Sequence, residues 1–359
     1  MYLSYQTYEH PFMFSYADFL DTVFLDHAIK SDVYYSNNLT IRGSALSFSR
    51  KTLIQRATGE FIERLSLFEG KSITEGRAQA SFRLLTGDVL EISKDEIFLE
   101  RTSKQYNDSS GVATHYDSFN AIKNAFFEYL ERQAFVFSWV HQIKGKIIDP
   151  GSLSKQNLNL KEKAFLYIDN LYIIDISLSK YVHVILIFGH GDVHKGIGLS
   201  AGVSFQRVVS KAFDEFFQSI AYMNNKHILK KINYYPHLIY NQKEKEDSHY
   251  YSLSPEEFSR EMEFFQKETK ISENFLEQEL TQDSFNKLLK SIEKELDTFF
   301  YCTFLPLRIN TNLKVARVFT LDLYTKLRVD LYENKEKSDY LNKMKLERVK
   351  QNRRPLPFP

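Results

Sequence analysis

The chain has 359 residues, of which 43% are hydrophobic and 15% aromatic. This composition is typical of a globular protein and excludes a disordered chain, and the length allows one large domain or two. The 47 basic and 46 acidic residues leave a net charge of +1. That balance argues against a general affinity for nucleic acid or for an anionic membrane.

Cysteine usage and hydropathy indicate a reducing, cytoplasmic location. The single cysteine, Cys302, excludes an internal disulfide framework, and its strand-like surroundings predict a buried apolar residue rather than a nucleophile. The N-terminus lacks the pattern of a signal peptide. The longest apolar run, Val182–Gly189, is too short to span a bilayer.

The first hundred residues predict a strand, a helix and a hairpin. Residues 1–36 are rich in aromatic side chains and fit no element clearly. Alternation over Leu39–Ser49 predicts a strand and turn, and the spacing of Arg50–Phe68 predicts a long helix that stops at Gly70. Ala80–Ile92 predicts a hairpin with a Thr-Gly-Asp turn.

A polar loop, Tyr106–Gly111, stands directly before the most apolar helix that the sequence predicts. Its small polar residues suit a close approach of phosphate or metal to the backbone. An ordinary loop that caps the next helix would have a similar composition. The carboxylates on the helix that follows make a binding role a competitive alternative.

That helix, Ala121–Trp139, carries three charged residues in the middle of an apolar sequence. Glu128, Glu131 and Arg132 lie three and four residues apart, so they project from one side of the helix. Burying such a group without a partner would cost on the order of several kcal/mol per ion. A hard divalent cation is one candidate partner.

The same Glu-x-x-Glu-Arg pattern occurs earlier, at Glu60, Glu63 and Arg64. A third helix, predicted over Val208–Tyr222, carries a Glu and a Gln at the same three-residue spacing. A carboxylate cluster of this kind would hold Mg²⁺ with the help of phosphate ligands, as in nucleotide sites. Each pair taken alone would also fit an ordinary ion pair on a helix surface. The repetition in three apolar helices favours a site.

The second half of the chain predicts more core strands and one charged insertion. The strands are expected over Tyr172–Ser177, Val182–Gly189, Asp297–Phe304 and Leu313–Leu321. Gly196–Gly202 is glycine-rich and matches no phosphate-loop pattern. Residues 241–297 predict a charged, solvated helical excursion from the core. Arg317 is predicted to lie among apolar neighbours on its strand, either in an ion pair or as an anion ligand.

The chain ends in QNRRPLPFP, residues 351–359. Pro355, Pro357 and Pro359 predict an extended segment, because proline fixes φ and disfavours helix before it. One interpretation is a disordered or adaptor-binding tail. The other is a rigid rod that places the terminal carboxylate at a defined position.

Taken together, these motifs resemble the YcaO family. The resemblance rests on the paired Glu-x-x-Glu-Arg helices, the polar loop, the later helix with Glu and Gln, the late strand with Arg317 and the terminal Pro-x-Pro-x-Pro. It covers the chain from about Arg42 to Pro359. It implies an α+β fold: a single large YcaO-type domain over residues 1–359, with mixed sheets and long buried helices that carry the nucleotide site.

The resemblance also implies an activity and its partners. Members of the family activate a backbone amide oxygen with ATP and Mg²⁺, and the proline-rich end marks the branch that forms azolines. A stand-alone cyclodehydratase of this branch makes thiazolines and oxazolines from Cys, Ser or Thr of a ribosomal precursor peptide in bacteriocin (microcin) biosynthesis. It would rely on an E1-like, leader-binding partner protein, and an FMN-dependent azoline dehydrogenase could belong to the same complex.

The resemblance assigns roles to individual residues. The Mg²⁺ ligands would be Glu60, Glu63, Glu128 and Glu131. The nucleotide or phosphate contacts would be Arg64, Ser109, Ser110, Arg132, Glu215, Gln218 and Arg317. Arg317 would also serve the reaction, and the terminal carboxylate of Pro359 would be the proton acceptor.

Two departures from the family pattern leave alternatives open. Arg56 stands where the family usually has Ser, and Leu46 lies where a Gly-Lys-Gly turn is common; Arg42, Lys51 or Arg56 could substitute for the missing contacts. A non-catalytic nucleotide-binding subunit therefore stays possible. Thioamide or amidine formation at the same ATP site is a further alternative, against which the proline-rich tail argues.

Overall fold

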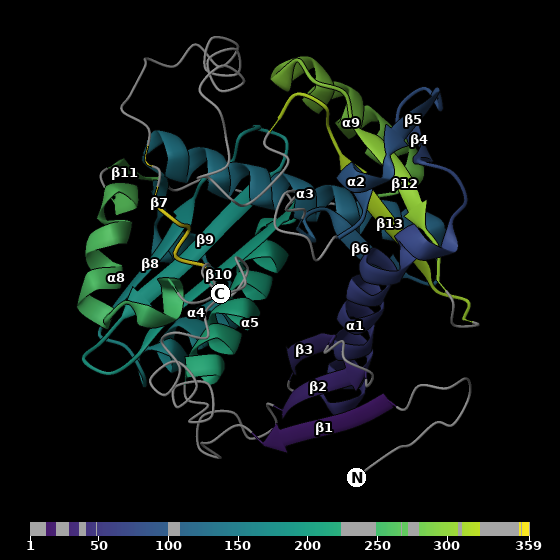
Figure 1. Ribbon diagram of the computed structural model, residues 1–359. Helices are drawn as coiled ribbons and strands as arrows, with labels where there is room; N and C mark the ends of the chain where they lie inside the picture. The colour runs from purple at the N-terminus through teal and green to yellow at the C-terminus, as the bar shows by residue number, and fades with distance from the viewer. Residues whose placement is uncertain are drawn as a thin grey trace. The chain divides into compact units, whose positions relative to one another are not determined.

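A computed structural model describes most of the chain, and its backbone forms three sheets with helices packed on them (Figure 1). The described residues are 12–18, 29–35, 41–47, 49–99, 108–223, 249–266, 268–271, 280–307, 311–323, 352 and 354–358. The chain divides into two compact units. The first comprises Met1–Tyr129 and Phe299–Thr320, and the second Leu130–Thr298 and Leu321–Pro359.

The first unit contains a three-stranded and a five-stranded antiparallel sheet. The small sheet has the order β1 (Phe12–Asp18), β2 (Ile29–Tyr35) and β3 (Arg42–Ser47). The larger one has the order β5 (Val89–Ser93), β4 (Ala78–Arg83), β12 (Tyr301–Leu305), β13 (Lys314–Phe319) and β6 (Val112–His115). Helices α1 (Arg50–Ile73) and α2 (Lys94–Ile97) belong to this unit.

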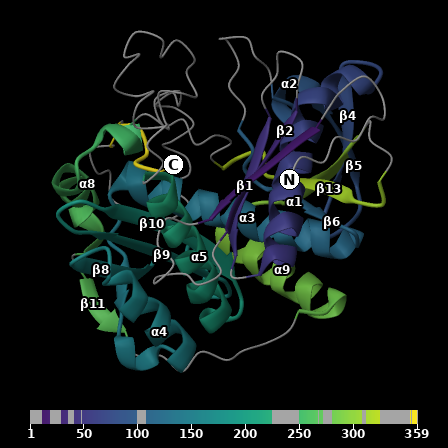
Figure 2. The same cartoon turned by 90° about the horizontal axis from the view of Figure 1, so that it is seen from below.

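Helix α1 owes its length to an apolar stripe. Leu53, Ala57, Phe61 and Leu65 recur every fourth residue, all are buried, and all belong to one apolar core. In both views of the molecule α1 lies beside the small sheet (Figures 1 and 2). Glu60 and Arg64 of the first Glu-x-x-Glu-Arg copy border this stripe and are about a third exposed, whereas Glu63 lies on another side of the helix.

The predicted stop of this helix at Gly70 is wrong, because α1 continues to Ile73. A methyl group at Gly70 would lie 2.1 Å from the Phe98 ring. The glycine thus serves close packing rather than helix termination. The predicted hairpin, by contrast, is confirmed as β4 and β5, with Gly87 at a φ of 77° in its turn.

The second unit is built on a five-stranded mixed sheet. Its order is β10 (Lys195–Gly202), β9 (His183–His190), β8 (Asn170–Asp175), β7 (Lys146–Ile148) and β11 (Glu268–Ile271). All neighbours are antiparallel except β11, which runs parallel to β7. The other elements are η1 (Pro150–Ser152), α4 (Lys155–Ala164), α5 (Phe205–Met223), α8 (Pro255–Met262), η2 (Glu263–Gln266) and α9 (Gln282–Leu296). Helix α3 (Ser118–His141) begins in the first unit and ends in the second.

The glycine-rich segment Gly196–Gly202 forms strand β10, which the sequence analysis did not predict. Every residue of the strand is buried, and α5 packs against it (Figures 1 and 2). A methyl group at Gly198 would lie 2.0 Å from the carbonyl oxygen of Ala212. The glycines of this strand therefore permit the close approach of a helix backbone instead of forming a loop.

The described part of residues 241–297 is packed rather than solvated. Helix α8 buries Phe258 and Met262, and α9 buries Phe285 and Leu289. Both helices are amphipathic, so most of their charged residues lie on the outer face, although Glu293 of α9 is buried. Together with the antiparallel and mixed sheets, these helices give the α+β fold that the sequence predicts. No helix in the described part of the chain is long and apolar enough to cross a membrane.

Candidate functional site

The helices that carry the predicted site share a local arrangement. In each one, a predicted site glutamate is followed by an aromatic residue that closely approaches a glycine at or beside a strand. The three sets are Glu60, Phe61 and Gly43; Glu128, Tyr129 and Gly111; and Glu215, Phe216 and Gly198. A methyl group on these glycines would lie 2.4–3.1 Å from the aromatic residue. The glycines thus fix each glutamate at short range from a neighbouring strand or loop.

The first copy of the repeat lies on α1, in the first unit. Arg64 Nη2 lies 2.5 Å from Glu60 Oε1, and both side chains are about a third exposed. Glu63 instead faces β6, where its Oε1 accepts a hydrogen bond of 2.7 Å from the Thr114 backbone N–H. In this copy, Glu60 therefore forms an ion pair within its own helix, and Glu63 is hydrogen-bonded to a strand.

The environment of Glu63 strongly favours the protonated acid. Burial first, and the nearby Glu60 charge second, raise the pKa of Glu63 to about 8, against the opposing effect of the Thr114 hydrogen bonds and the Arg64 charge. A carboxyl held in this way would be stabilised as the anion by a bound cation. The donor chemistry at Glu63 thus fits a metal ligand.

The polar loop is held in one conformation beside β13. Asp108 Oδ1 accepts a hydrogen bond of 2.9 Å from the Ser110 N–H, and the Gly111 carbonyl accepts one of 2.7 Å from the Val318 N–H. Gly111 has a φ of 70°, and a methyl group there would lie 2.3 Å from the Val318 oxygen. Only glycine fits both constraints, so the loop backbone is fixed where it meets the strand.

Arg317 is buried on β13, opposite Val112 of β6. Its Nη1 donates to the Ile97 carbonyl oxygen, whereas its Nε has no hydrogen-bond partner among the described residues. Burial lowers the pKa of Arg317, and the charges of Asp108 and Glu128 oppose that shift. The guanidinium therefore keeps acidic neighbours and one unused donor.

Several buried polar atoms among the described residues of the first unit lack a hydrogen-bond partner. The two that lie in the polar loop and beside its predicted ligands are the Ser110 hydroxyl oxygen and Arg317 Nε; Thr114 Oγ1 of β6, Ser81 Oγ and Arg83 Nε are further such atoms of this unit. Buried polar groups are nearly always paired, so two such donors suggest a missing acceptor. An anion such as a phosphate would accept hydrogen bonds from both types of donor. Ser109, the other predicted loop contact, is half-buried.

The second copy of the repeat continues along α3 into the second unit. Arg132 Nε lies 3.6 Å from Glu131 Oε1, and its guanidinium lies 4.6 Å from the centre of the Phe358 ring. The two charged side chains are 18% and 9% exposed, respectively. This copy is therefore more deeply buried than the first, and its arginine is covered by an aromatic ring.

Glu131 and Glu215 form an electrostatically coupled pair in the second unit. Burial first, and the Glu215 charge second, raise the pKa of Glu131 well above its usual range; Arg132 opposes the shift. Burial also raises the pKa of Glu215, whose Oε2 accepts a hydrogen bond of 3.3 Å from the Leu199 N–H. Like charges at close range favour a shared proton or a bound cation.

Other predicted contacts have different outcomes. Gln218 lies one turn after Glu215 on α5 and is half-buried, whereas Pro359 lies outside the described residues. Arg56 Nη1 donates a hydrogen bond of 3.2 Å to the Leu46 carbonyl oxygen, so the two departures from the family pattern contact each other. Within the described ranges, no three acidic, histidine or cysteine side chains are grouped to hold a metal ion. The four-carboxylate metal site stays a prediction.

The structure adds contacts that sequence reasoning missed. Asp108 fixes the loop, and Phe358 covers Arg132. Asp108 follows the Asx-turn rule and could have been assigned from its position before two serines. Phe358 could not, since the partner of an aromatic side chain in an extended tail depends on the tertiary structure.

The sheets and the carboxylate-bearing helices define an α+β protein, and each unit holds buried acidic and basic side chains. Comparison with known proteins identifies its family: residues 97–319 match the family described as YcaO cyclodehydratase, ATP- and Mg²⁺-binding. The chain belongs to the YcaO family. No curated protein sequence matches it.

Several solved structures share the fold. A chain of the E. coli microcin synthetase McbBCD complex with pro-MccB17 bound aligns with a TM-score of 0.72 at 16% identity, covering 100% of this chain and 99% of that one. YcaO from Methanopyrus kandleri, bound with AMPPCP and Mg²⁺, aligns with a TM-score of 0.68 at 13% identity, covering 84% of each chain. A heterocyclase in complex with substrate and cofactor aligns at 0.69 and 11% identity, covering 96% of this chain and 54% of that chain.

Proposed function

We propose that the chain is an ATP-dependent cyclodehydratase that converts Cys, Ser or Thr of a ribosomal precursor peptide into thiazoline or oxazoline. The observation that carries the proposal is its membership of a family described as ATP- and Mg²⁺-binding cyclodehydratases. The terminal Pro-x-Pro-x-Pro adds the azoline-forming branch. Similarity in fold to a microcin synthetase and to a heterocyclase supports the same reaction class.

The residues of the site fit ATP and Mg²⁺. Glu60, Glu63, Glu128 and Glu131 would hold the metal; the raised pKa values of Glu63 and Glu131 mark carboxyls that a cation would stabilise as anions. Arg64, Ser109, Ser110, Arg132, Glu215, Gln218 and Arg317 would contact the nucleotide. The unused donors of Ser110 and Arg317 match an anionic ligand.

Bound ATP and Mg²⁺ would supply the phosphoryl group that turns the amide oxygen of the peptide into a leaving group. The chain itself would contribute positioning and charge. Arg132 and Arg317 would offset negative charge on phosphate oxygens, and their burial strengthens that effect. The terminal carboxylate of Pro359 would accept the proton of the attacking hydroxyl or thiol. The peptide then loses one water for each ring formed.

The proposal includes partners. The precursor peptide is the substrate, and an E1-like protein would bind its leader, as the resemblance to stand-alone cyclodehydratases implies. A microcin synthetase complex with its pro-peptide bound is the structural precedent. An FMN-dependent dehydrogenase would oxidise azolines to azoles in the same complex.

Mass spectrometry of the modified peptide tests the proposal. The purified chain, its partner protein and the precursor peptide should give an ATP-dependent loss of water. Glu131→Gln should remove that change because the substitution removes a charged ligand at the centre of the second copy. A gain of sulfur would instead establish thioamide formation, and ATP-independent or absent modification would refute the enzymatic assignment.

A further inference from the structure

The described end of the chain is bound to the last turns of α3. The Asn352 N–H donates a hydrogen bond of 2.8 Å to the Val140 carbonyl oxygen, and Trp139 Nε1 donates one of 3.0 Å to the Arg354 carbonyl oxygen. Carbonyls in the last turn of a helix have no partner within the helix, and a buried indole N–H needs an acceptor. The tail provides a hydrogen-bond donor for the Val140 carbonyl and an acceptor for the Trp139 indole N–H.

The tail then follows one face of α3 towards the second Glu-x-x-Glu-Arg copy. Arg132, Phe135 and Trp139 are three and four residues apart, so they lie on the same face of the helix. The Phe358 ring lies 5.5 Å from the Phe135 ring and 4.6 Å from the Arg132 guanidinium, between centres. Phe358 therefore covers the arginine of the copy.

The lengths of the two segments agree. From Arg132 to Trp139 the helix rises about 10 Å. An extended chain with proline geometry spans about 12 Å from Arg354 to Phe358. Pro355 and Pro357 keep this stretch extended, so the ring at its end arrives at Arg132 with little conformational entropy left to lose.

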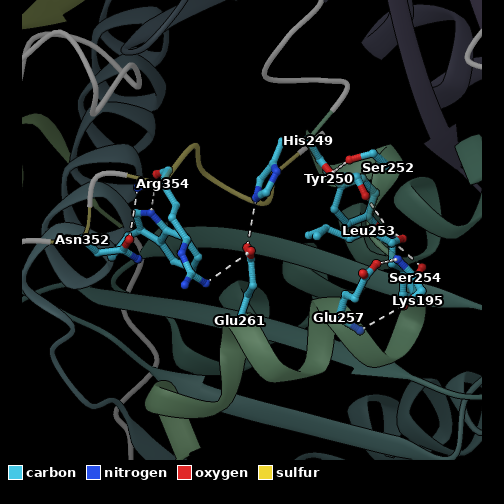
Figure 3. Close-up of polar contacts among 11 residues, drawn as sticks. Lys195, His249, Tyr250, Ser252, Leu253, Ser254, Glu257, Glu261, Asn352 and Arg354 are labelled. Carbon is cyan, nitrogen blue, oxygen red and sulfur yellow. Dashed lines mark hydrogen bonds and ion pairs between the residues drawn. The ribbon is translucent and has the colours of Figure 1, made fainter. Parts of the chain in front are cut away.

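Helix α8 and η2 form the other side of this binding surface. Phe264 and Phe265 of η2 pack on Trp139 and Phe135, with ring centres 5.7 Å and 6.2 Å apart. Figure 3 shows Glu261 of α8 between His249 and Arg354. Glu261 Oε1 lies 3.7 Å from Arg354 Nη1.

The second oxygen of Glu261 lies 3.0 Å from His249 Nε2. The Glu261 side chain is 11% exposed, whereas that of Arg354 is 69% exposed. An ion pair with one exposed partner contributes little by itself. The position of the ion pair depends on how firmly the Glu261 side chain is held, and the rest of α8 holds it.

A buried lysine anchors the start of α8. Lys195 of β10 is fully buried, and its Nζ donates to the carbonyl oxygens of Tyr250 and Leu253 (Figure 3). Ser254 and Glu257 form a capping box at the first turn. The sheet thus fixes α8 before the helix reaches Glu261.

We propose that α8, η2 and the face of α3 that carries Arg132, Phe135 and Trp139 form a seat for the C-terminal tail, and that the seated tail positions Arg132 through Phe358. Trp139, Phe135 and Glu261 are positioning residues in this account, since they act through the tail. The consequence of the seat for nucleotide binding rests on the proposed function, because that function assigns Arg132 to the nucleotide.

Coupling between the tail and the nucleotide follows from the shared arginine. If a seated tail holds Arg132 in its binding orientation, nucleotide must in turn favour the seated tail by the same factor. The ring face over a guanidinium contributes roughly 0.5–1 kcal/mol at partly exposed sites, which corresponds to about a two- to five-fold change in affinity.

Fluorescence offers a direct measurement of the seat, because Trp139 is the only tryptophan. In the full chain Trp139 is buried and bonded to the tail, so acrylamide should quench it weakly. Phe358→Ala should increase the quenching constant by about two-fold or more, with an emission shift to longer wavelength, and Glu261→Gln, which removes a weak ion pair, should increase it by less. Glu256→Gln is the matched control: it is an exposed glutamate of the same helix. Quenching that stays at the wild-type level in both test variants would overturn the seat.

A second measurement tests the coupling with a non-hydrolysable ATP analogue and Mg²⁺. Phe358→Ala should weaken binding of the analogue by about two- to five-fold, whereas Phe358→Tyr, which keeps the ring, should restore it. Equal affinity of Phe358→Ala and wild type, together with increased quenching of Trp139, would overturn the coupling. A wild-type chain that binds no analogue would refute the proposed function, while the quenching data would still decide the seat. Circular dichroism and thermal unfolding confirm that each variant is folded.

Discussion

The two Glu-x-x-Glu-Arg copies have the same residue types but different surroundings. On α1, Arg64 bonds Glu60 of its own helix, and both side chains stay about a third exposed. On α3, Arg132 lies beside Glu131 and beneath the Phe358 ring, and both charges are largely buried. A repeated motif therefore fixes which charges are present, whereas neighbouring elements decide how strongly each one is held.

The second glutamate of each copy, Glu63 in the first and Glu131 in the second, also has different contacts. Glu63 is held by a strand N–H, which orients its carboxylate without neutralising it. Glu131 also bonds a strand backbone, at Ala201, but the carboxylate that raises its pKa is Glu215 of another helix, whereas for Glu63 it is Glu60 of the same helix. The first copy thus has a fixed geometry, and the second has the larger electrostatic demand. The predictions below test this contrast.

The largest effect is expected at the tail, which reaches the second copy. Extending the chain by two residues beyond Pro359 should slow ring formation by about 10²–10⁴-fold, the usual contribution of a positioned base. Affinity for the ATP analogue and quenching of Trp139 should change little, since the seat ends at Phe358. Azoline formation by mass spectrometry provides the measurement. Full activity of the extended chain would remove the terminal carboxylate from the mechanism.

The next largest effect concerns the protonation of Glu63 in metal-free protein. Because the folded pKa, about 8, exceeds the ordinary value of 4.5, the folded chain binds one more proton than the unfolded chain between these limits. The free energy of unfolding should therefore fall as the pH rises from about 4.5 to 8, by at most about 1.4 kcal/mol per pH unit from this group. Glu63→Gln should remove that part of the slope.

Denaturant unfolding at several pH values measures this slope. Glu69→Gln, on the same helix, is the control and should keep the wild-type dependence. If Glu63→Gln leaves the slope unchanged, the first copy does not hold a protonated acid, and its contrast with the second copy widens. Saturating Mg²⁺ with nucleotide should flatten the wild-type dependence, because a bound cation favours the ionised carboxylate.

The repeated carboxylates could be read from sequence because they depend on helical spacing alone. Glu60, Glu63, Glu128 and Glu131 require only that residues three apart share a helix side. The identity of what holds them could not be read: Thr114 is 51 residues from Glu63 and bonds it through a backbone N–H that any residue type supplies. The residue types of the candidate site could thus be read from the sequence, whereas the contacts that hold them could not.

Glycine explains most of the errors in the predicted fold. At Gly70 the sequence suggested a helix stop, and at Gly198 it predicted no element, yet both positions serve the close approach of another element. The sequence cannot distinguish a glycine that ends a helix from one that allows close packing. Which role a glycine has depends on a residue distant in sequence, Phe98 for Gly70 and Ala212 for Gly198. Gly87 was assigned correctly because its turn is local.

A smaller effect is expected at Gly43, where β3 packs closely against the helix of the first copy. Gly43→Ala should destabilise the chain by about 1–3 kcal/mol, since the added methyl group would lie 2.1 Å from the Ala57 oxygen and 2.4 Å from Phe61 N. Gly59→Ala is the matched variant on α1: it has nothing within 4 Å and should stabilise by roughly 0.5–1 kcal/mol. Thermal unfolding measures both. Two changes of the same sign would contradict the account of Gly43.

The smallest expected effect compares the two arginines directly, in the absence of nucleotide. Arg64→Lys should change the free energy of unfolding by less than about 0.5 kcal/mol, because a lysine can still pair with Glu60 at this exposed position. Arg132→Lys should cost about 0.5–1 kcal/mol, since a compact ammonium cannot replace the planar guanidinium over the Phe358 ring.

A double-mutant cycle isolates the contribution of the ring to this difference. In a Phe358→Ala background, Arg132→Lys should cost no more than Arg64→Lys, because the ring that distinguishes the two sites is gone. Denaturant unfolding of the six chains measures each term. If Arg132→Lys keeps its full cost without the ring, the difference between the copies arises from Glu131 and Glu215 rather than from the tail. The tail would then occupy its seat without acting on Arg132.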